Sequence, residues 1–147
     1  MFWNRLKRRA GKAQRGQSLV EFSLTAIIII MILSGLLDLG RLWFIYIALE
    51  DGAGEAALFL AINPTCETAA DCPDPNNAEW RARHSAGGVL DWSTVNIITN
   101  VTVKAPGLPV EVTLEYPYRI LTPLISQIAG QITLTAYASQ TIVDISP

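Results

Sequence analysis

An apolar run near the N-terminus places the strongest constraint on the fold of this chain. From Leu19 to Leu37 the side chains are apolar apart from one acid and three hydroxyl residues. A helix of about nineteen residues is roughly 28 Å long, which is close to the thickness of the hydrocarbon core of a bilayer. A secretory signal peptide has a shorter apolar region with a small-residue cleavage site after it, and no clean Ala-x-Ala site follows this run. The run therefore predicts a membrane-spanning helix that stays in the protein.

Charge is distributed unevenly on the two sides of this run. Residues 1–16 contain no acid, whereas all 13 Asp and Glu residues of the chain come later. The bases of this first segment are Arg5, Lys7, Arg8, Arg9, Lys12 and Arg15. Basic residues beside an apolar span remain on the cytoplasmic side, so we expect a cytoplasmic N-terminus and a C-terminal part outside. The segment lacks apolar periodicity, so we expect it to be poorly ordered. Because no second basic patch exists, we expect no nucleic-acid partner.

The helix is expected to extend beyond the membrane. Trp43 and Tyr46 suit the outer interface, where rings that are partly apolar and partly polar collect. Asn63-Pro64 ends the helix, because the residue before a proline avoids the helical region. We therefore predict one helix over residues 17–62. Its outer half presents an apolar face that needs a protein partner, and this face consists of Leu49, Ala53, Ala56 and Leu60.

The last third of the chain changes from a helical period to the period of two that is typical of strands. Residues 95–104 and 110–116 alternate between apolar and polar side chains, which predicts a hairpin with a Pro-Gly turn. Pro117 cannot donate a hydrogen bond to a neighbouring strand, so we expect the second strand to end there or to lie at an edge. A short helix over residues 120–129 and a third strand over residues 132–142 follow.

Together these elements predict an α+β fold in which a long N-terminal helix packs on a small three-stranded antiparallel sheet. The sheet has one apolar face, and such a face needs a cover. The outer half of the long helix offers a matching face of small side chains. Helix and sheet would then form a head outside the cytoplasm, with residues 63–147 packed on the helix that carries them.

Residues 63–77 form a polar loop, rich in Pro, Asp and Asn, that holds both cysteines of the chain, Cys66 and Cys72. A location outside the cytoplasm permits a disulfide between them, and two free thiols are the alternative. The acids of the loop leave calcium binding open, but their spacing does not match an EF-hand and a solvated loop is favoured. A single histidine without a Cys-x-x-Cys pair does not supply four metal ligands, so we expect no metal and no other cofactor.

Asn77 is positioned to cap a helix over residues 78–90. This helix contains the only histidine of the sequence, His84. A catalytic histidine acts with a nucleophile and an orienting acid, and the sequence offers no matching set for His84. We therefore interpret His84 as a surface residue and expect the chain not to be an enzyme.

The border between the basic segment and the apolar run holds a distinctive group of residues. Gly16 ends the basic segment, and Glu21 and Phe22 follow at the start of the apolar run. A charged side chain costs on the order of 2.5–3.5 kcal/mol at the centre of a membrane span and less near its edge, so Glu21 needs a cation. Arg15 is a nearby partner if Glu21 is an ordinary acid at a membrane border.

This arrangement resembles the processing site of type IV prepilins. The segments GQSLVEFSL and LLDLGRLWF, the Ala- and Gly-rich extension after them and the C-terminal TLTAYAS are similar to the TadE-like family of pseudopilins from tight-adherence (Tad) systems. The specific part of the resemblance is residues 15–62. It implies a pilin-like fold and cleavage by a prepilin peptidase between Gly16 and Gln17. Glu21 would become the fifth residue of the mature chain, and the new α-amino group of Gln17, in the same or a neighbouring subunit, would be its cation.

The resemblance also implies a role and a set of partners. The chain would be a minor pilin or pseudopilin with three parts. These parts are a removable leader (residues 1–16), a helix (17–62) and a head (63–147). It would serve the assembly or the tip of an adhesion-related type IVc pilus. Its partners would be other pilin subunits through the N-terminal helix, the prepilin peptidase, inner-membrane pilus assembly proteins and the lipid bilayer. It would lie in the inner membrane as a single-pass protein, or in the extracellular pilus after processing. The alternative is an unprocessed single-pass protein whose outer domain scaffolds a secretion or envelope complex.

Overall fold

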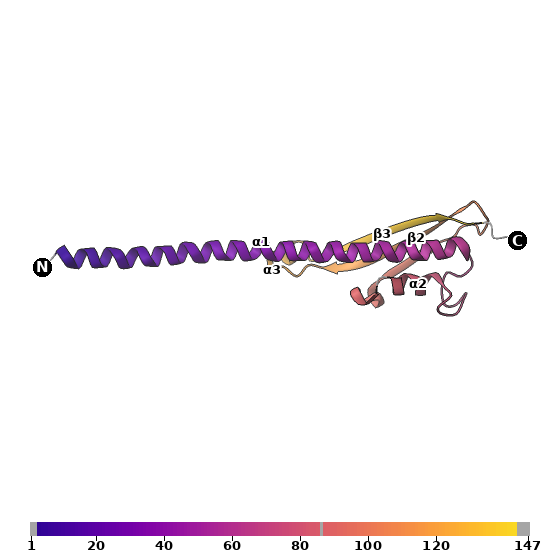
Figure 1. Ribbon diagram of the computed structural model, residues 1–147, viewed down its shortest axis with the longest axis horizontal. Coiled ribbons are helices and arrows are strands. Elements are labelled where there is room, and N and C mark those ends of the chain that lie inside the picture. The colour runs from indigo at the N-terminus through magenta and orange to yellow at the C-terminus, as the bar shows by residue number, and fades with distance from the viewer. Residues whose placement is uncertain (1–2, 86, 144–147) are drawn as a thin grey trace. The chain divides into compact units, whose positions relative to one another are not determined.

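The computed structural model describes residues 3–85 and 87–143, with side chains from residue 16 onward except those of residues 89, 124 and 128. The chain forms two compact units, Met1–Asp38 and Leu39–Pro147, and the first helix contributes to both. The elements, in chain order, are α1 (Trp3–Ile62), α2 (Ala78–Ser85), the 3-10 helices η1 (Gly87–Val89) and η2 (Trp92–Thr94), β1 (Asn96–Asn100), β2 (Pro109–Arg119), α3 (Pro123–Ala129) and β3 (Gln131–Thr141) (Figure 1).

The helix α1 begins well before the residue that the sequence predicted. It starts at Trp3 rather than at Gln17, so the predicted start of the helix was wrong. The physical reason is local propensity, because Lys, Arg, Gln and Ala are all strong helix formers and proline is absent before Pro64. The end of the helix agrees with the prediction. The amide of Asn63 still donates to the carbonyl of Phe59 at 2.9 Å, and the chain leaves the helix before Pro64.

The first unit is a helix whose apolar side chains have no cover in the described structure. Among its large apolar side chains from Leu19 to Leu37, the least exposed is Met31, at 41%. This helix is long and apolar enough to cross a membrane. Three of its hydroxyl groups suit apolar surroundings, because each of the three donates to the carbonyl four residues earlier. These bonds run from Ser23 to Leu19 at 2.5 Å, from Thr25 to Glu21 at 2.9 Å and from Ser34 to Ile30 at 2.8 Å.

The second unit confirms the predicted α+β fold. Its sheet has the order β1-β2-β3 and is antiparallel throughout, with Leu114 of β2 opposite Ile97 of β1 and Ala136 of β3. The C-terminal part of α1 packs on one face of this sheet (Figure 1). The core contains fully buried side chains from both elements. They are Leu49, Ala53, Ala56 and Leu60 from α1, and Val110, Val112, Leu114 and Tyr118 from β2.

Two strands differ from their predicted form. The strand β1 ends at Asn100, four residues earlier than expected. The strand β2 is central and continues through Pro117, which lies opposite Thr133 of β3, so the prediction for this proline was wrong in part. The ladder between β1 and β2 ends at the pair Asn96 and Glu115. Beyond that pair β2 is paired with β3 and no longer with β1. The absence of an amide hydrogen on Pro117 therefore removes no hydrogen bond to β1.

A capped turn joins the long helix to the rest of the second unit. The side-chain oxygen of Asn77 accepts from the amide of Trp80 at 2.7 Å, which is the predicted cap of α2. The helix α2 ends at Ser85 rather than at residue 90, and the chain next passes through Gly87 at φ 62°. A positive φ is readily adopted by glycine and breaks a helix. Just before the cap, a disulfide joins Cys66 and Cys72, whose Cα atoms are 5.2 Å apart.

Candidate processing and assembly segment

The residues predicted for processing lie together on α1, within the first unit. Gly16 is exposed, and a Cβ atom added there would meet nothing within 4 Å. The side-chain amide of Gln17 donates to Oε1 of Glu21 at 3.1 Å, as residues four apart on a helix can do. Phe22 is exposed beside Glu21. The helix therefore presents an acid, its amide partner and an aromatic ring on an accessible surface.

The hydrogen bond from Gln17 gives the carboxylate of Glu21 a neutral partner in this structure. An amide donor satisfies one carboxylate oxygen but supplies no positive charge. A cation would stabilise a carboxylate further at the border of an apolar helix. Gln17 is the residue that would carry the new amino group after cleavage. The structure therefore brings together the two residues that the processing hypothesis pairs.

A second exposed surface of α1 lies in the second unit. Its apolar side chains point away from the sheet and remain accessible, and they are Trp43, Phe44, Ile47 and Leu58. Glu50 and Asp51 are exposed on the same stretch of helix. The helix thus has one face committed to the core of the head and another face that is open to a partner.

The predicted disulfide loop is held against the sheet by one acid. Glu67 lies next to Cys66, and its Oε2 accepts from the hydroxyl of Thr99 in β1 at 2.7 Å. Its Oε1 lies 3.1 Å from Nζ of Lys104. Within the loop, Asp71 accepts from the amide and the hydroxyl of Thr68, and these hydrogen bonds lower the pKa of the Asp71 carboxyl. These bonds fix the loop internally and join it to β1.

His84 takes part in a packed surface cluster. Its Nδ1 lies 2.8 Å from the carbonyl of Trp80, and its ring stacks on the Trp80 ring with 3.9 Å between centroids. Nearby, Arg83 pairs with Glu79 at 2.6 Å and donates to the carbonyl of Trp92 at 2.6 Å. Each of these contacts links α2 to itself or to η2. The cluster can stabilise α2.

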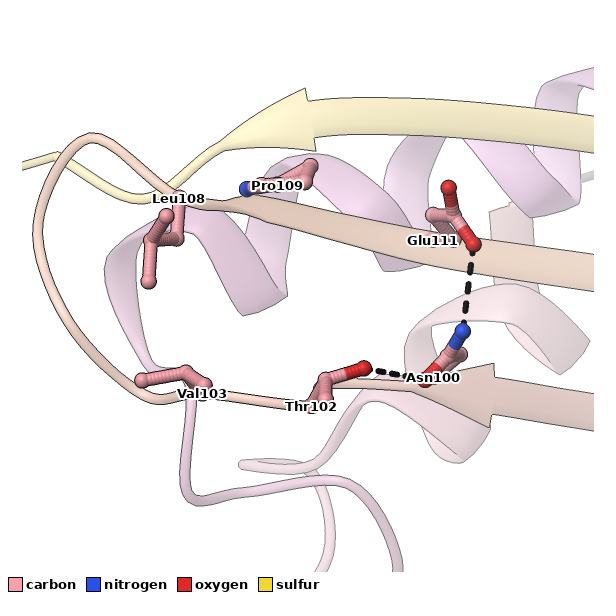
Figure 2. Close-up of a pocket in the computed structure, with 6 residues that line it drawn as sticks. All are labelled: Asn100, Thr102, Val103, Leu108, Pro109 and Glu111. Atoms are coloured by element: carbon pink, nitrogen blue, oxygen red, sulfur yellow. Dashed lines mark hydrogen bonds between the residues drawn. The ribbon is translucent and has the colours of Figure 1, made fainter.

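A small hollow of about 170 Å³ lies between β1 and the start of β2 (Figure 2). In it the amide of Asn100 donates to Glu111 at 3.2 Å, and Asn100 accepts from the hydroxyl of Thr102 at 3.0 Å. Tyr137 of β3 donates to the other oxygen of Glu111 at 2.9 Å. The polar groups of the hollow are thus engaged with one another across all three strands. Its rim is apolar and consists of Val103, Leu108 and Pro109 (Figure 2).

Two contacts of the second unit were not predicted. The guanidinium carbon of Arg41 lies 5.6 Å from the centre of the Tyr118 ring, and Glu67 joins the loop to β1 as described. Both link residues that are far apart in the chain. Nothing in the local pattern of the sequence signals such a pair. For metal ligands, no group of three His, Cys, Asp or Glu side chains comes together among the described residues.

Comparison with protein families gives a match to the first part of the chain. Residues 16–58 match the model of the TadE-like protein family, and this segment contains the candidate processing residues and most of the buried face of α1. No curated protein and no solved structure shows a significant match to the chain. The matched segment begins at Gly16, the residue that the sequence analysis placed at the end of a leader. Over residues 16–58 the chain is therefore similar to the TadE-like protein family.

Proposed function

We propose that the chain is a minor pilin or pseudopilin that takes part in the assembly or the tip of an adhesion-related type IVc pilus. The family match over residues 16–58 carries this proposal. It is supported by an uncovered apolar helix with one acid near its start, which is a surface suited first to lipid and then to other helices. The chain would act by packing: the helices hold subunits together, and the head presents a surface. No catalytic step is assigned to it.

A prepilin peptidase would cut the bond between Gly16 and Gln17. In the intact chain this bond lies within a continuous helix, so the helix must open locally before a peptidase can bind the backbone on both sides. Glycine favours that opening, because it is about 1 kcal/mol less favourable than alanine in a helix interior. Cleavage would remove all bases that precede Gly16 and leave an α-amino group on Gln17.

The new amino group would replace the amide as the main partner of Glu21. The two residues are already joined at 3.1 Å through the Gln17 side chain. A carboxylate paired with a cation is stabilised more than one paired with a neutral amide, especially in apolar surroundings. The amino group of the same subunit would neutralise Glu21 before assembly. The amino group of a neighbouring subunit would fix the axial position of one helix against the next.

The protein would reside in the inner membrane as a single-pass protein with a cytoplasmic N-terminus, before any transfer into an extracellular pilus. Its partners would be other pilin subunits, inner-membrane pilus assembly proteins and the prepilin peptidase. The positive segment that precedes Gly16 supports this orientation. The disulfide between Cys66 and Cys72 supports it as well, because disulfides persist outside the cytoplasm.

Mass spectrometry of the membrane-extracted protein tests the processing step. A mature chain that begins at Gln17 is the expected result in cells that contain the peptidase. A chain that keeps residues 1–16 in those cells would overturn the proposal. It would instead favour the alternative, an unprocessed membrane protein whose outer domain scaffolds an envelope complex.

A Glu21→Ala variant tests the role of the acid separately. We expect normal cleavage, because the change lies on the far side of the cut, and a reduced amount of protein in sheared filaments. Asp51→Ala is the matched control, because Asp51 is another exposed acid of α1 but lies outside the apolar run. Loss of cleavage in the Glu21 variant, with normal incorporation of whatever is cleaved, would contradict this division of roles.

A further inference from the structure

One end of the sheet lies beside the first turns of α1 in the second unit. Tyr118, near the end of β2, sits under the guanidinium of Arg41 at 5.6 Å. At the opposite end of the sheet, the amide of Val143 donates to the carbonyl of Ala61 at 2.9 Å. The sheet therefore runs along α1 from residue 41 to residue 61. Because α3 connects β2 to β3, it belongs to the end marked by Arg41 (Figure 1).

This end of the second unit exposes apolar side chains. Leu121 is 63% exposed and Ile125 is 43% exposed, although both belong to the connection that should cover the end of the sheet. Trp43 and Phe44 are exposed on the neighbouring turns of α1. A small domain that is surrounded by water on all sides rarely exposes several large apolar side chains together at one end. A partner of apolar character is therefore expected there.

Cationic groups and a hollow lie among these apolar side chains. Arg41 and Arg119 are both exposed at the same end. A hollow of about 600 Å³ opens between the end of β2 and α3, with Arg119, Ser126 and Gln131 as polar lining and Ile120 and Leu121 as apolar lining. Arginine beside apolar side chains is the combination that matches a phosphate group above acyl chains.

The position of this end along the chain identifies the partner. Arg41 comes four residues after Leu37, the last residue of the apolar run, and four residues of helix rise about 6 Å. The headgroup region on each side of a bilayer is roughly 5–8 Å thick, from a total of about 40–45 Å and a core of about 30 Å. Arg41, which contacts this end of the sheet through Tyr118, therefore follows the apolar run along the chain by about the depth of a headgroup region. Tryptophan and arginine collect in that region.

We infer that the α3 end of the head rests on the outer phospholipid surface. Leu121 and Ile125 enter the boundary between headgroups and acyl chains, and Arg119 faces lipid phosphates from the hollow. Helices that lie in the membrane interface bury their apolar side about 5–10 Å deep. The side chains of Leu121 and Ile125 can reach that depth. This inference rests on the proposed membrane anchoring. It adds that the head has a second contact with the bilayer besides the span.

Depth-dependent quenching in vesicles tests the contact. The full chain is reconstituted into phospholipid vesicles with or without bromine on the acyl chains, and one dye-labelled cysteine is introduced at a time. The native cysteines are joined in a disulfide and do not react. The positions are Ile125, Ile28 within the apolar run, and Leu108 at the opposite end of the sheet. Leu108 is the matched control, because it is 38% exposed against 43% for Ile125.

The three positions give distinguishable outcomes. We expect bromolipid to lower the fluorescence at positions 28 and 125 by about twofold or more, and to leave position 108 unchanged, because only the first two lie within the bilayer. A Leu121→Asp change should abolish most of the quenching at position 125 and leave position 28 quenched.

Quenching at position 28 with none at position 125 would overturn the inference and leave the proposed membrane anchoring intact. It would point to a neighbouring protein subunit as the partner of this end. Absence of quenching at 28 would overturn the proposed membrane location itself.

Discussion

Gly52 is a residue at which three elements approach α1 closely. A Cβ atom added there would lie 3.0 Å from Cη2 of Trp92 and 3.1 Å from both the carbonyl oxygen of Ala82 and Cδ1 of Leu114. Two of these atoms belong to side chains that can move by a few tenths of an ångström. The carbonyl oxygen belongs to the backbone of α2 and can move only with the helix. Gly54, two residues later on the same helix, has nothing within 4 Å of an added Cβ.

This difference predicts opposite effects of the same substitution. Gly54→Ala should raise the midpoint of thermal unfolding in detergent micelles, because alanine is about 0.8–1 kcal/mol more favourable than glycine in a helix. Gly52→Ala gains the same propensity but loses more through overpacking, which typically costs about 1–3 kcal/mol. The midpoint should therefore fall for Gly52→Ala. Equal stabilisation by both variants would show that α2 and η2 do not press on α1.

The sequence could not distinguish these two glycines. Both interrupt an alanine-rich helix, so helix propensity treats them alike. The neighbours that matter at Gly52 come from α2, η2 and β2, which are distant in the chain. The contact between Gln17 and Glu21 was easier to predict, because the two residues are four positions apart on one helix.

At the scale of elements, α1 has two faces that serve different purposes. Leu60 is fully buried in the core of the head, whereas Leu58, two residues earlier, is 52% exposed. Leu60→Ala should lower the free energy of unfolding by about 2–5 kcal/mol, since it removes buried methyl groups and leaves a cavity. Leu58→Ala is the matched control and should change it by less than about 0.5 kcal/mol. Denaturant unfolding, followed by tryptophan fluorescence, measures both. Similar losses in the two variants would contradict the packing of this helix on the sheet.

The disulfide loop is a second element whose contribution can be measured. The two cysteines are separated by 6 positions, so the bond closes a small ring. A ring of this size contributes about 2 kcal/mol in the chain-entropy model. The double variant Cys66→Ser and Cys72→Ser should lose roughly that amount, and Glu67 should still hold the loop on β1. Chemical denaturation under non-reducing conditions measures the loss, and an unchanged midpoint would show that the bond does not constrain the unfolded chain.

Sequence patterns predicted these elements unevenly, and the reasons are physical. The alternation in β2 and β3 was clear, because one face of each strand is buried and the other is accessible. The cap at Asn77 depends on residues within one turn and was therefore predicted correctly. The helical start at Trp3 was missed because residues 3–15 lack an apolar face, although their propensity is high. The passage of β2 through Pro117 depends on where β1 ends, and no local pattern contains that information.

At the scale of the molecule, the head is complete only when β3 is in place. Leu134, Ala136 and Ile142 are buried in the core, and they come from the last described part of the chain. A chain that ends at Gly130 would lack β3, which pairs with β2 from residue 109 to residue 119, and would leave the buried face of α1 partly uncovered. We expect this truncated chain to insert into the membrane but to lose its folded head.

Proteolysis of spheroplasts measures this loss from the outside. The full chain should resist trypsin over residues 39–143, whereas the chain truncated after Gly130 should be cut within that region, because open segments are cleaved and packed segments are protected. A chain that ends after Val143 is the control, since it retains every core residue that the structure describes. Equal resistance of the two truncated chains would show that β3 is dispensable for the fold.

The bond between Val143 and Ala61 bears on how the protein is made. The ribosome delivers α1 first, and the residues that close the core follow about 80 positions later, which takes on the order of 4–16 s at usual rates of synthesis. During that interval the alanine-rich face of α1 lacks the complete sheet that covers it. If the head lies outside the cytoplasm, as proposed, its folding must wait until β3 has crossed the membrane. Export and folding would then be consecutive events, and a stalled export would leave the buried face of α1 partly uncovered.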